Sequence, residues 1–262
     1  MRVFTCVCVV LMLLFTLMIM GVLVALCLPL PIRDLLQALA SRETFFALRL
    51  SLSCSVLATI ISLLWGVPTG YLLARKDFFG KALLDILMDI PMIIPPLVVG
   101  IGLMFLFSSS ALGKPLEALG IRILFTPLGA CVAQTFIAVP IIIRTSRAAF
   151  EDVDIRYESA ALTLGSSALH AFFKITLPLA ANGILSGALL AMARAMGEFG
   201  ATLMVAGATR MKTETLPIAV YLNISSGEIG IALACSWILM GAGLILLIIL
   251  KLIGKISQIN SR

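Results

Sequence analysis

Residues 151–179, EDVDIRYESAALTLGSSALHAFFKITLPL, form the longest polar segment of an otherwise strongly apolar chain. Asp152 and Asp154 suit a helix N-terminus, where side-chain oxygens cap free N–H groups and negative charge favours the helix dipole. Gly165 is able to end that helix in a left-handed turn, and a second short helix is expected before Pro178 begins the next apolar run. The segment therefore predicts a pair of short helices between two membrane spans. An ordinary amphipathic loop is the alternative.

The composition indicates an all-α integral membrane protein. Of the 262 residues, 61% are hydrophobic and only 12% are charged, whereas soluble domains carry about 25% charged residues. The net charge of +6 comes from single basic residues between apolar runs, so it does not indicate nucleic-acid binding. The sequence contains no G-x-x-x-x-G-K-[ST] or G-x-S-x-G motif and no Cys/His ligand spacing, so we expect no enzymatic site, cofactor or metal.

The apolar runs predict six transmembrane helices within a single domain, residues 1–262. Their approximate limits are 3–28, 48–74, 86–107, 127–149, 178–205 and 229–253. An amphipathic connector, residues 33–49, is expected at the membrane interface. More of the 19 Lys and Arg residues fall on one predicted side, which the positive-inside rule assigns to the cytoplasm. Both termini and the loop 151–177 are then cytoplasmic.

The predicted third span contains the sequence PMIIPPLVVG, with Pro91, Pro95 and Pro96. Prolines break the hydrogen-bond ladder of a membrane helix, and this is tolerated where the freed carbonyls are buried in protein or line a water-filled path. The prolines therefore indicate either a wall of a pathway or a simple kink.

The predicted fifth span carries a charged pair inside the membrane, in the sequence RAMGEFGAT from Arg194 to Thr202. A charge at the bilayer centre costs about 2.5–3.5 kcal/mol on insertion scales, so it is expected to face protein or water. Arg194 and Glu198 are four residues apart, which places them on one face of a continuous helix and allows them to pair. Gly197 and Gly200 provide small-residue faces. The pair either contributes to a path for an anion, together with Thr202, or only locks helix packing.

Three separate segments carry a resemblance to a known family. The spacing Gly165-x9-Ile175-x-Leu177-Pro178, preceded by Glu158-Ser-Ala-Ala161, resembles the EAA loop of ABC-importer permeases. ARAMGEFGATLMVAG with KTETLPIAVY, and PMIIPPLVVG, resemble the molybdate/sulfate branch of these permeases, and most of all its molybdate members. One position departs from the pattern: Glu158 lies seven residues before Gly165, where the family has six.

The resemblance implies a type I ABC-importer fold and a set of partners. Two copies of the chain would form the pathway, and two ABC ATPases would dock on the cytoplasmic coupling loop and hydrolyse ATP. A periplasmic or surface-anchored binding protein would deliver molybdate, tungstate or sulfate to a prokaryotic inner membrane. For coupling to the ATPase, the resemblance implies Glu158, Ser159, Ala160, Ala161, Gly165, Ile175, Leu177 and Pro178. For the translocation path, the helix-breaking prolines, the charged pair and the small residues described above indicate Pro95, Pro96, Arg194, Gly197, Glu198, Gly200 and Thr202. For binding-protein docking or an outer gate, the resemblance implies Lys212, Thr213 and Thr215, although an ordinary loop is also possible there.

A transporter of another class is the alternative. An ion-coupled secondary transporter or channel without an ATPase would need a titratable residue in the membrane, and Glu198 is a candidate.

Overall fold

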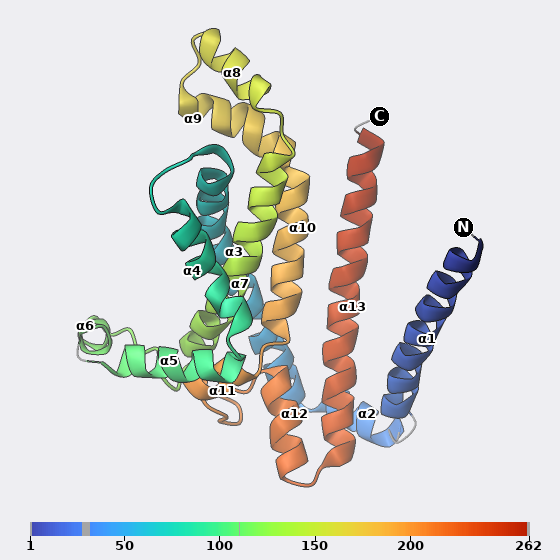
Figure 1. Cartoon of the computed structure of the whole chain (residues 1–262). Coiled ribbons are helices and arrows are strands. Elements are labelled where there is room, and N and C mark those ends of the chain that lie inside the picture. The colour runs from blue at the N-terminus through green and yellow to red at the C-terminus, as the bar shows by residue number, and fades with distance from the viewer. Residues whose placement is uncertain (1, 28–31, 110, 261–262) are drawn as a thin grey trace.

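The computed structural model describes residues 2–27, 32–109 and 111–260, and all regular structure in these ranges is helical (Figure 1). The elements are α1 (Arg2–Cys27), α2 (Ile32–Ala40), α3 (Arg42–Arg75), α4 (Lys81–Ile93), α5 (Pro96–Ser108), α6 (Gly113–Ala118), α7 (Pro127–Glu151), α8 (Ile155–Thr163), α9 (Ala168–Ala171), the π-helix η1 (Phe172–Thr176), α10 (Leu177–Met196), α11 (Gly200–Ala206), α12 (Leu216–Ser225) and α13 (Ile229–Asn260). Five helices in these ranges are long and apolar enough to cross a membrane, or six if a bent pair counts as one span. The all-α membrane fold is confirmed.

Helix α7 is the centre of the bundle, with α3 and α10 packed against it. Small residues make this close packing possible, as is usual between membrane helices. A Cβ built on Gly66 of α3 would lie 2.6 Å from Ile142 Cγ2, and one on Gly183 of α10 would lie 2.6 Å from Ala149 Cβ. Larger side chains at these positions would therefore push α3 or α10 away from α7.

Helix α3 begins earlier than the predicted second span. Ser41 is its N-cap, and the Ser41 hydroxyl accepts a hydrogen bond from the Thr44 N–H at 3.0 Å. The predicted connector 33–49 is therefore α2 followed by the first two turns of α3.

The predicted third span is two helices, α4 and α5, which meet at an angle of 110°. The turn follows from Pro95 and Pro96, because a residue that precedes proline is driven out of the helical region. Ile94 and Pro95 are both extended, with ψ of 134°. As a result α5 runs across the bundle, nearly perpendicular to the long helices (Figure 1).

The predicted fifth span is also interrupted. Helix α10 ends at Met196, and the separate helix α11 begins at Gly200. At its other end, α10 is continuous with η1 and α9, so Pro178 lies inside a helical segment that begins at Ala168. The π-turn places the Leu177 N–H on the Phe172 carbonyl, a wider turn directly before the proline.

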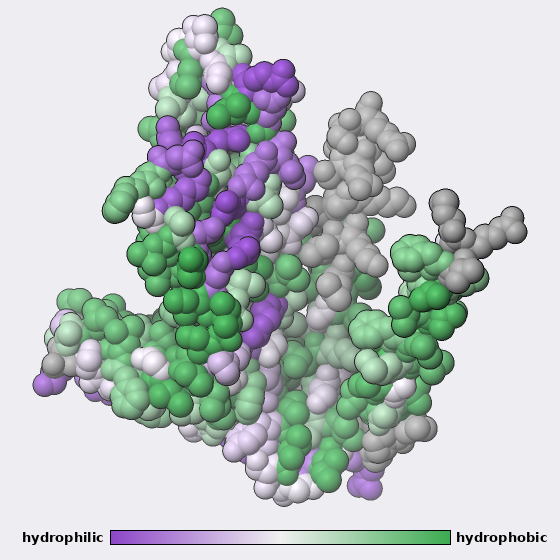
Figure 2. Space-filling view, viewed as in Figure 1, coloured by the Kyte–Doolittle hydropathy of each residue, from purple (hydrophilic) through white to green (hydrophobic). Residues whose placement is uncertain are grey.

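The two ends of the bundle differ in character. Helices α8 and α9 project from the end that Figure 1 shows at the top, whereas α2 and the α12–α13 turn lie at the opposite end. Figure 2 shows hydrophilic residues gathered on the upper part of this face, below α8, and hydrophobic residues over α5 and α1. Helix α1 stands beside α13, where the Trp237 indole donates to the Leu26 carbonyl at 3.2 Å.

Candidate functional site

Helix α8, the first helix of the 151–177 loop, begins with a capping carboxylate. Asp154 is its N-cap, and Asp154 Oδ1 accepts from the Arg156 backbone N–H at 2.9 Å. The Arg156 guanidinium, which donates to Asp154 Oδ2 at 2.8 Å, lowers the pKa of Asp154 to about 2, and the backbone bond adds to this effect. The capping role predicted for Asp154 is confirmed. Asp152 is not part of this cap, because it is the C-cap of α7.

The predicted left-handed turn at Gly165 is confirmed, with φ of +87°. Its N–H donates to the Leu162 carbonyl at 3.0 Å, and the Ser166 N–H donates to the Ala161 carbonyl at 3.0 Å. These two bonds satisfy carbonyls that the end of α8 would leave free, and they reverse the chain into α9. A hairpin of two short helices follows, which we call the coupling hairpin (residues 154–176).

Glu158 points back toward the membrane bundle. Its Oε1 lies 3.5 Å from Arg75 Nε and accepts a hydrogen bond from the Thr176 hydroxyl. Arg75 also donates to the Val153 carbonyl at 2.6 Å. Only 12% of the Glu158 side chain is exposed, so it offers little surface to a partner protein. Its carboxylate instead ties the coupling hairpin to the end of α3.

The other predicted coupling residues divide into two groups. Ser159, Ala160, Gly165 and Pro178 are exposed. Ala161 is buried, and Ile175 and Leu177 are partly buried. Leu177 packs against a cluster at the base of the hairpin, so it supports the hairpin from inside.

Aromatic rings fasten the hairpin to α3 and α7. Tyr71 of α3 meets Phe150 of α7 edge-on, with ring centroids 5.4 Å apart, and meets Phe172 of η1 with centroids 4.7 Å apart. Phe150 is fully buried. Edge-to-face contacts of this kind add roughly 0.5–1.5 kcal/mol each beyond area burial. Together with Arg75 and Glu158, these rings attach the hairpin to α3 and α7.

Large hydrophobic side chains are exposed on the hairpin, beside polar ones such as Arg156. Leu164 is 86% exposed and Leu169 is 72% exposed. Other large hydrophobic side chains are exposed beside them: Ile155, Tyr157, Leu162 and Phe173. Exposed hydrophobic side chains gathered in this way mark protein–protein or membrane interaction sites.

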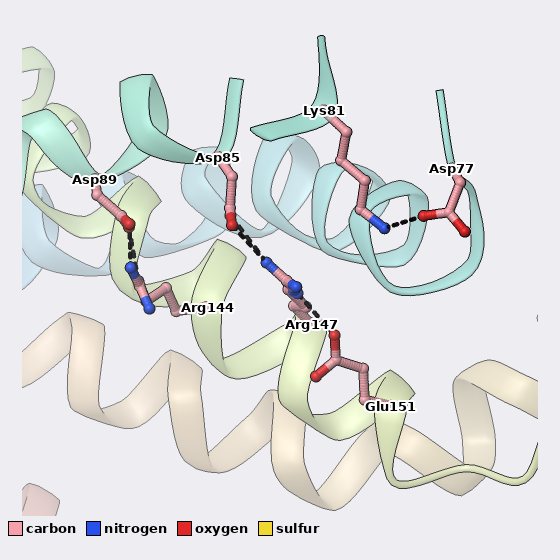
Figure 3. Close-up of polar contacts among 7 residues, drawn as sticks. All are labelled: Asp77, Lys81, Asp85, Asp89, Arg144, Arg147 and Glu151. Atoms are coloured by element: carbon pink, nitrogen blue, oxygen red, sulfur yellow. Dashed lines mark hydrogen bonds and ion pairs between the residues drawn. The ribbon is translucent and has the colours of Figure 1, made fainter. Parts of the chain in front are cut away.

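Ion pairs hold α4 against α7 near the same end of the bundle (Figure 3). Arg147 Nη1 donates to both oxygens of Asp85 at 2.9 Å, and Arg147 Nε donates to Glu151 at 2.8 Å. One turn along α4, Asp89 pairs with Arg144. No described residue of α4 is buried, so these charges are its main attachment to α7.

Arg194 and Glu198 pair, but they do not share a continuous helix. Arg194 Nη1 donates to Glu198 Oε2 at 2.6 Å, while the Ala201 N–H donates to Glu198 Oε1 at 3.1 Å. Glu198 lies in the break after α10, where its carboxylate satisfies a free N–H of α11. The predicted pairing is confirmed and the predicted helical geometry is wrong. The two residues do not share one helix because the chain leaves the helical conformation at Gly197.

The remaining predicted path residues meet at two helix breaks. A Cβ on Gly200 would lie 3.0 Å from the Leu97 N, so Gly200 lets α11 approach the corner formed by Pro95 and Pro96. Gly197 is exposed. Thr202 is fully buried, and its hydroxyl has no hydrogen-bond partner among the described residues.

The loop 207–215 buries two of its three predicted docking or gating residues. Thr213 and Thr215 are each 0% exposed, and the Thr213 hydroxyl accepts from the Thr209 N–H at 3.1 Å. Both hydroxyls are enclosed by the fold of the loop, which argues against direct docking, and a role at an outer gate stays a prediction. Lys212 is exposed.

Several polar residues in these sites were not predicted. Arg75, Arg144 and Arg147 were interpreted only as topology signals, yet all three form ion pairs. The available signal was their spacing in the sequence. Asp85 and Asp89 are four residues apart on one predicted span, and Arg144 and Arg147 are three residues apart at the end of the next span. Gln134 of α7 was also missed; it is fully buried, and its amide atoms have no partner among the described residues.

The family of this chain follows from a comparison with known proteins. Residues 66–256 match the family described as binding-protein-dependent transport system inner membrane component. The chain belongs to this family. The matched range begins within α3 and includes the coupling hairpin and both helix breaks.

Individual relatives place the chain in the molybdate/sulfate branch. It is 39% identical to the molybdenum transport system permease protein ModB of Escherichia coli K12, over 81% of this chain and 94% of that protein. It is 41% identical to the molybdate/tungstate transport system permease protein WtpB of Pyrococcus abyssi, over 80% of this chain and 78% of that protein. Among solved structures, a bacterial alginate ABC transporter in complex with its periplasmic protein matches with a TM-score of 0.63 and 15% identity, over 90% of this chain and 92% of that one. This last likeness supports the fold alone.

Proposed function

We propose that this chain is the membrane-spanning subunit of an ATP-driven importer for molybdate or a related tetrahedral oxyanion, tungstate or sulfate. The observation that carries the proposal is a coupling hairpin that exposes large hydrophobic side chains and is fixed to α3 and α7 at its base. The names of the relatives support the substrate class.

Two ABC ATPases are the proposed partners at the cytoplasmic end. Leu164 and Leu169 would enter a groove on the ATPase, and the exposed Ser159, Ala160 and Gly165 would allow a close approach. Closure of the ATPases around ATP would then move each hairpin. Because the hairpin is joined to the bundle through Arg75 and the Tyr71 rings, the helices would follow as a rigid body.

A second copy of the chain is the proposed partner within the membrane, with the pathway between the two. Its wall would include the Pro95–Pro96 corner, Gly197, Gly200 and the Arg194–Glu198 pair. The positive member of the pair is the more accessible one: 41% of the Arg194 side chain is exposed, compared with only 2% of the Glu198 side chain. An anion at this surface would therefore meet the guanidinium, with the carboxylate held behind it.

A periplasmic or surface-anchored oxyanion-binding protein is the proposed partner at the opposite end, where Lys212 is exposed. We therefore also propose that the protein lies in a prokaryotic cell membrane with both termini cytoplasmic. An ion-coupled transporter without an ATPase is less well supported, because both oxygens of Glu198 already have partners.

Uptake into proteoliposomes tests the proposal. The chain would be reconstituted with its ATPase and binding protein, and radiolabelled molybdate, tungstate and sulfate would be compared. We expect uptake that requires ATP and all three components. Oxyanion uptake by the chain alone, without any ATPase, would refute the proposal, as would failure of the ATPase to copurify in mild detergent.

A further inference from the structure

Helix α3 carries an apolar groove on one of its faces. The groove has a volume of about 600 Å³ and is lined mainly by large hydrophobic side chains, including Phe45, Leu52, Val56 and Ile60. These residues lie seven, four and four positions apart, so they share one face of the helix and form a single stripe along it. At one end the groove continues into a second hollow of about 430 Å³, which shares Phe45 and Arg49 with it.

Two arginines stand at that end of the groove. Arg49 lines both hollows, and Arg42 lines the second, seven residues earlier on the same face of α3. Both side chains are exposed, and neither has an ion-pair partner within the described ranges. The acid between them is engaged elsewhere, because Glu43 accepts from Arg210 at 2.8 Å.

The length of α3 places these arginines at the surface of a membrane. The charge-free run from Leu50 to Ala74 is about 37 Å of helix, which exceeds a hydrocarbon core of about 30 Å. Arg49 therefore falls at the boundary of the core, and Arg42 lies about 10 Å further out. Helix α2 is consistent with a membrane surface at the position of these arginines. Leu36 and Leu39 on this short amphipathic helix are 61% and 58% exposed, as expected for side chains that enter the membrane interface.

We propose that this groove binds one anionic phospholipid, with its phosphate between Arg42 and Arg49 and an acyl chain along the stripe from Phe45 to Ile60. The positive charge of the two arginines favours a lipid over a protein helix as the occupant of the groove. Helix α1 of a second copy would match the apolar stripe, but α1 contains no acidic residue and would leave both guanidinium groups without a counter-charge. A phosphodiester supplies the charge and the apolar chain in one molecule.

Native mass spectrometry of the detergent-purified protein tests the proposal. The protein would be titrated with dioleoyl phosphatidylglycerol and, separately, with dioleoyl phosphatidylcholine. We expect one phosphatidylglycerol to bind in preference, and Arg42→Gln/Arg49→Gln to weaken it about 30-fold, since each arginine near an anionic headgroup contributes a factor of roughly five. Arg122→Gln is the matched control, because it removes an exposed arginine outside the groove and is expected to leave binding unchanged.

Two further arms separate the lipid from other occupants. Ser53→Phe, which fills the groove from an exposed position, is expected to reduce phosphatidylglycerol binding while both arginines remain. Glycerol 3-phosphate at millimolar concentration is expected not to compete, because it has the phosphate without the acyl chains. Equal lipid binding by the double arginine variant, or full competition by glycerol 3-phosphate, would overturn the proposal. Cross-linking of Val56→Cys to α1 of a second copy in native membranes would also overturn it.

Discussion

Glu158 of the coupling hairpin faces Arg75 at the end of α3, with 3.5 Å between Glu158 Oε1 and Arg75 Nε, and both side chains are almost withdrawn from solvent. Eighty-three positions separate them in the chain, so the contact joins the proposed ATPase-binding element to a helix of the membrane bundle. We therefore expect movement of the hairpin to be transmitted to α3 through this pair.

We expect Glu158→Ala and Arg75→Ala each to reduce ATP-dependent uptake strongly. Each leaves one largely buried charge without its partner, which costs about 3–5 kcal/mol for fully buried pairs and less at this partly hydrated site. Thermal unfolding and uptake would be measured together. Lys76→Ala, which removes an exposed charge next to Arg75, is the control. Wild-type uptake in both charge variants would show that the pair does not transmit motion.

Gly165→Val is expected to uncouple ATP hydrolysis from uptake. A side chain at φ of +87° is strained by roughly 1–2 kcal/mol, and a β-branched residue is the least tolerant of it. Gly165→Asn is the matched control, because asparagine adopts the left-handed conformation readily. ATPase activity per oxyanion transported would be compared. If valine and asparagine behaved alike, the turn geometry would not be what coupling requires.

Arg194→Ala is expected to lower stability more than Arg194→Ala/Glu198→Gln. The single change leaves the buried Glu198 carboxylate with only the Ala201 N–H, at a cost of about 1–3 kcal/mol. The double change removes that charge and retains an oxygen for the same N–H. The melting temperatures of the purified variants decide between them. Equal melting temperatures would argue against a stabilising pair.

The attachment of α4 to α7 predicts rescue by charge exchange. Asp89→Arg and Arg144→Asp each place like charges together, so each is expected to loosen α4 and reduce uptake. The combined variant is expected to recover most of the activity. Asp77→Asn is the control, because Asp77 pairs with Lys81 at the start of α4 and not with α7. Absence of any recovery in the combined variant would contradict an electrostatic attachment.

Glu214 predicts a pH dependence of stability. Burial raises the pKa of this carboxyl above its usual value of 4.5, so the folded state binds its proton more tightly than the unfolded state. The contribution of Glu214 to the free energy of unfolding is then largest below about pH 4.5. It decreases as pH rises through the folded-state pKa. Glu214→Gln is expected to raise the melting temperature by a few degrees at pH 8 and not at pH 4. Glu117→Gln, an exposed carboxyl in another part of the molecule, is the control. An equal effect at both pH values would contradict the raised pKa.

Much of the helical scaffold followed from the sequence, because apolar length and Gly or Pro punctuation act locally. The end of α8 at Gly165 required only the left-handed turn, and the first turn of α8 required only Asp154. The 110° bend between α4 and α5 was not predicted, although Pro95 and Pro96 marked the place. Prolines disrupt a helix locally, but the angle depends on what α5 packs against, and here α11 lies against it through Gly100 and Gly200.

The sequence by itself determined that this protein is an all-helical membrane permease with a hinged polar loop, since composition, span length and the Gly165–Pro178 spacing are properties of neighbouring residues. Only the tertiary structure decided the partners of the charges: Glu158 with Arg75, Asp89 with Arg144, and Glu198 with the start of α11. Charged groups in an apolar bundle must find partners because isolated charges are costly there, and that cost does not specify which partner is near. The packing of α3, α4 and α10 around α7 determines which charged groups lie close enough to pair.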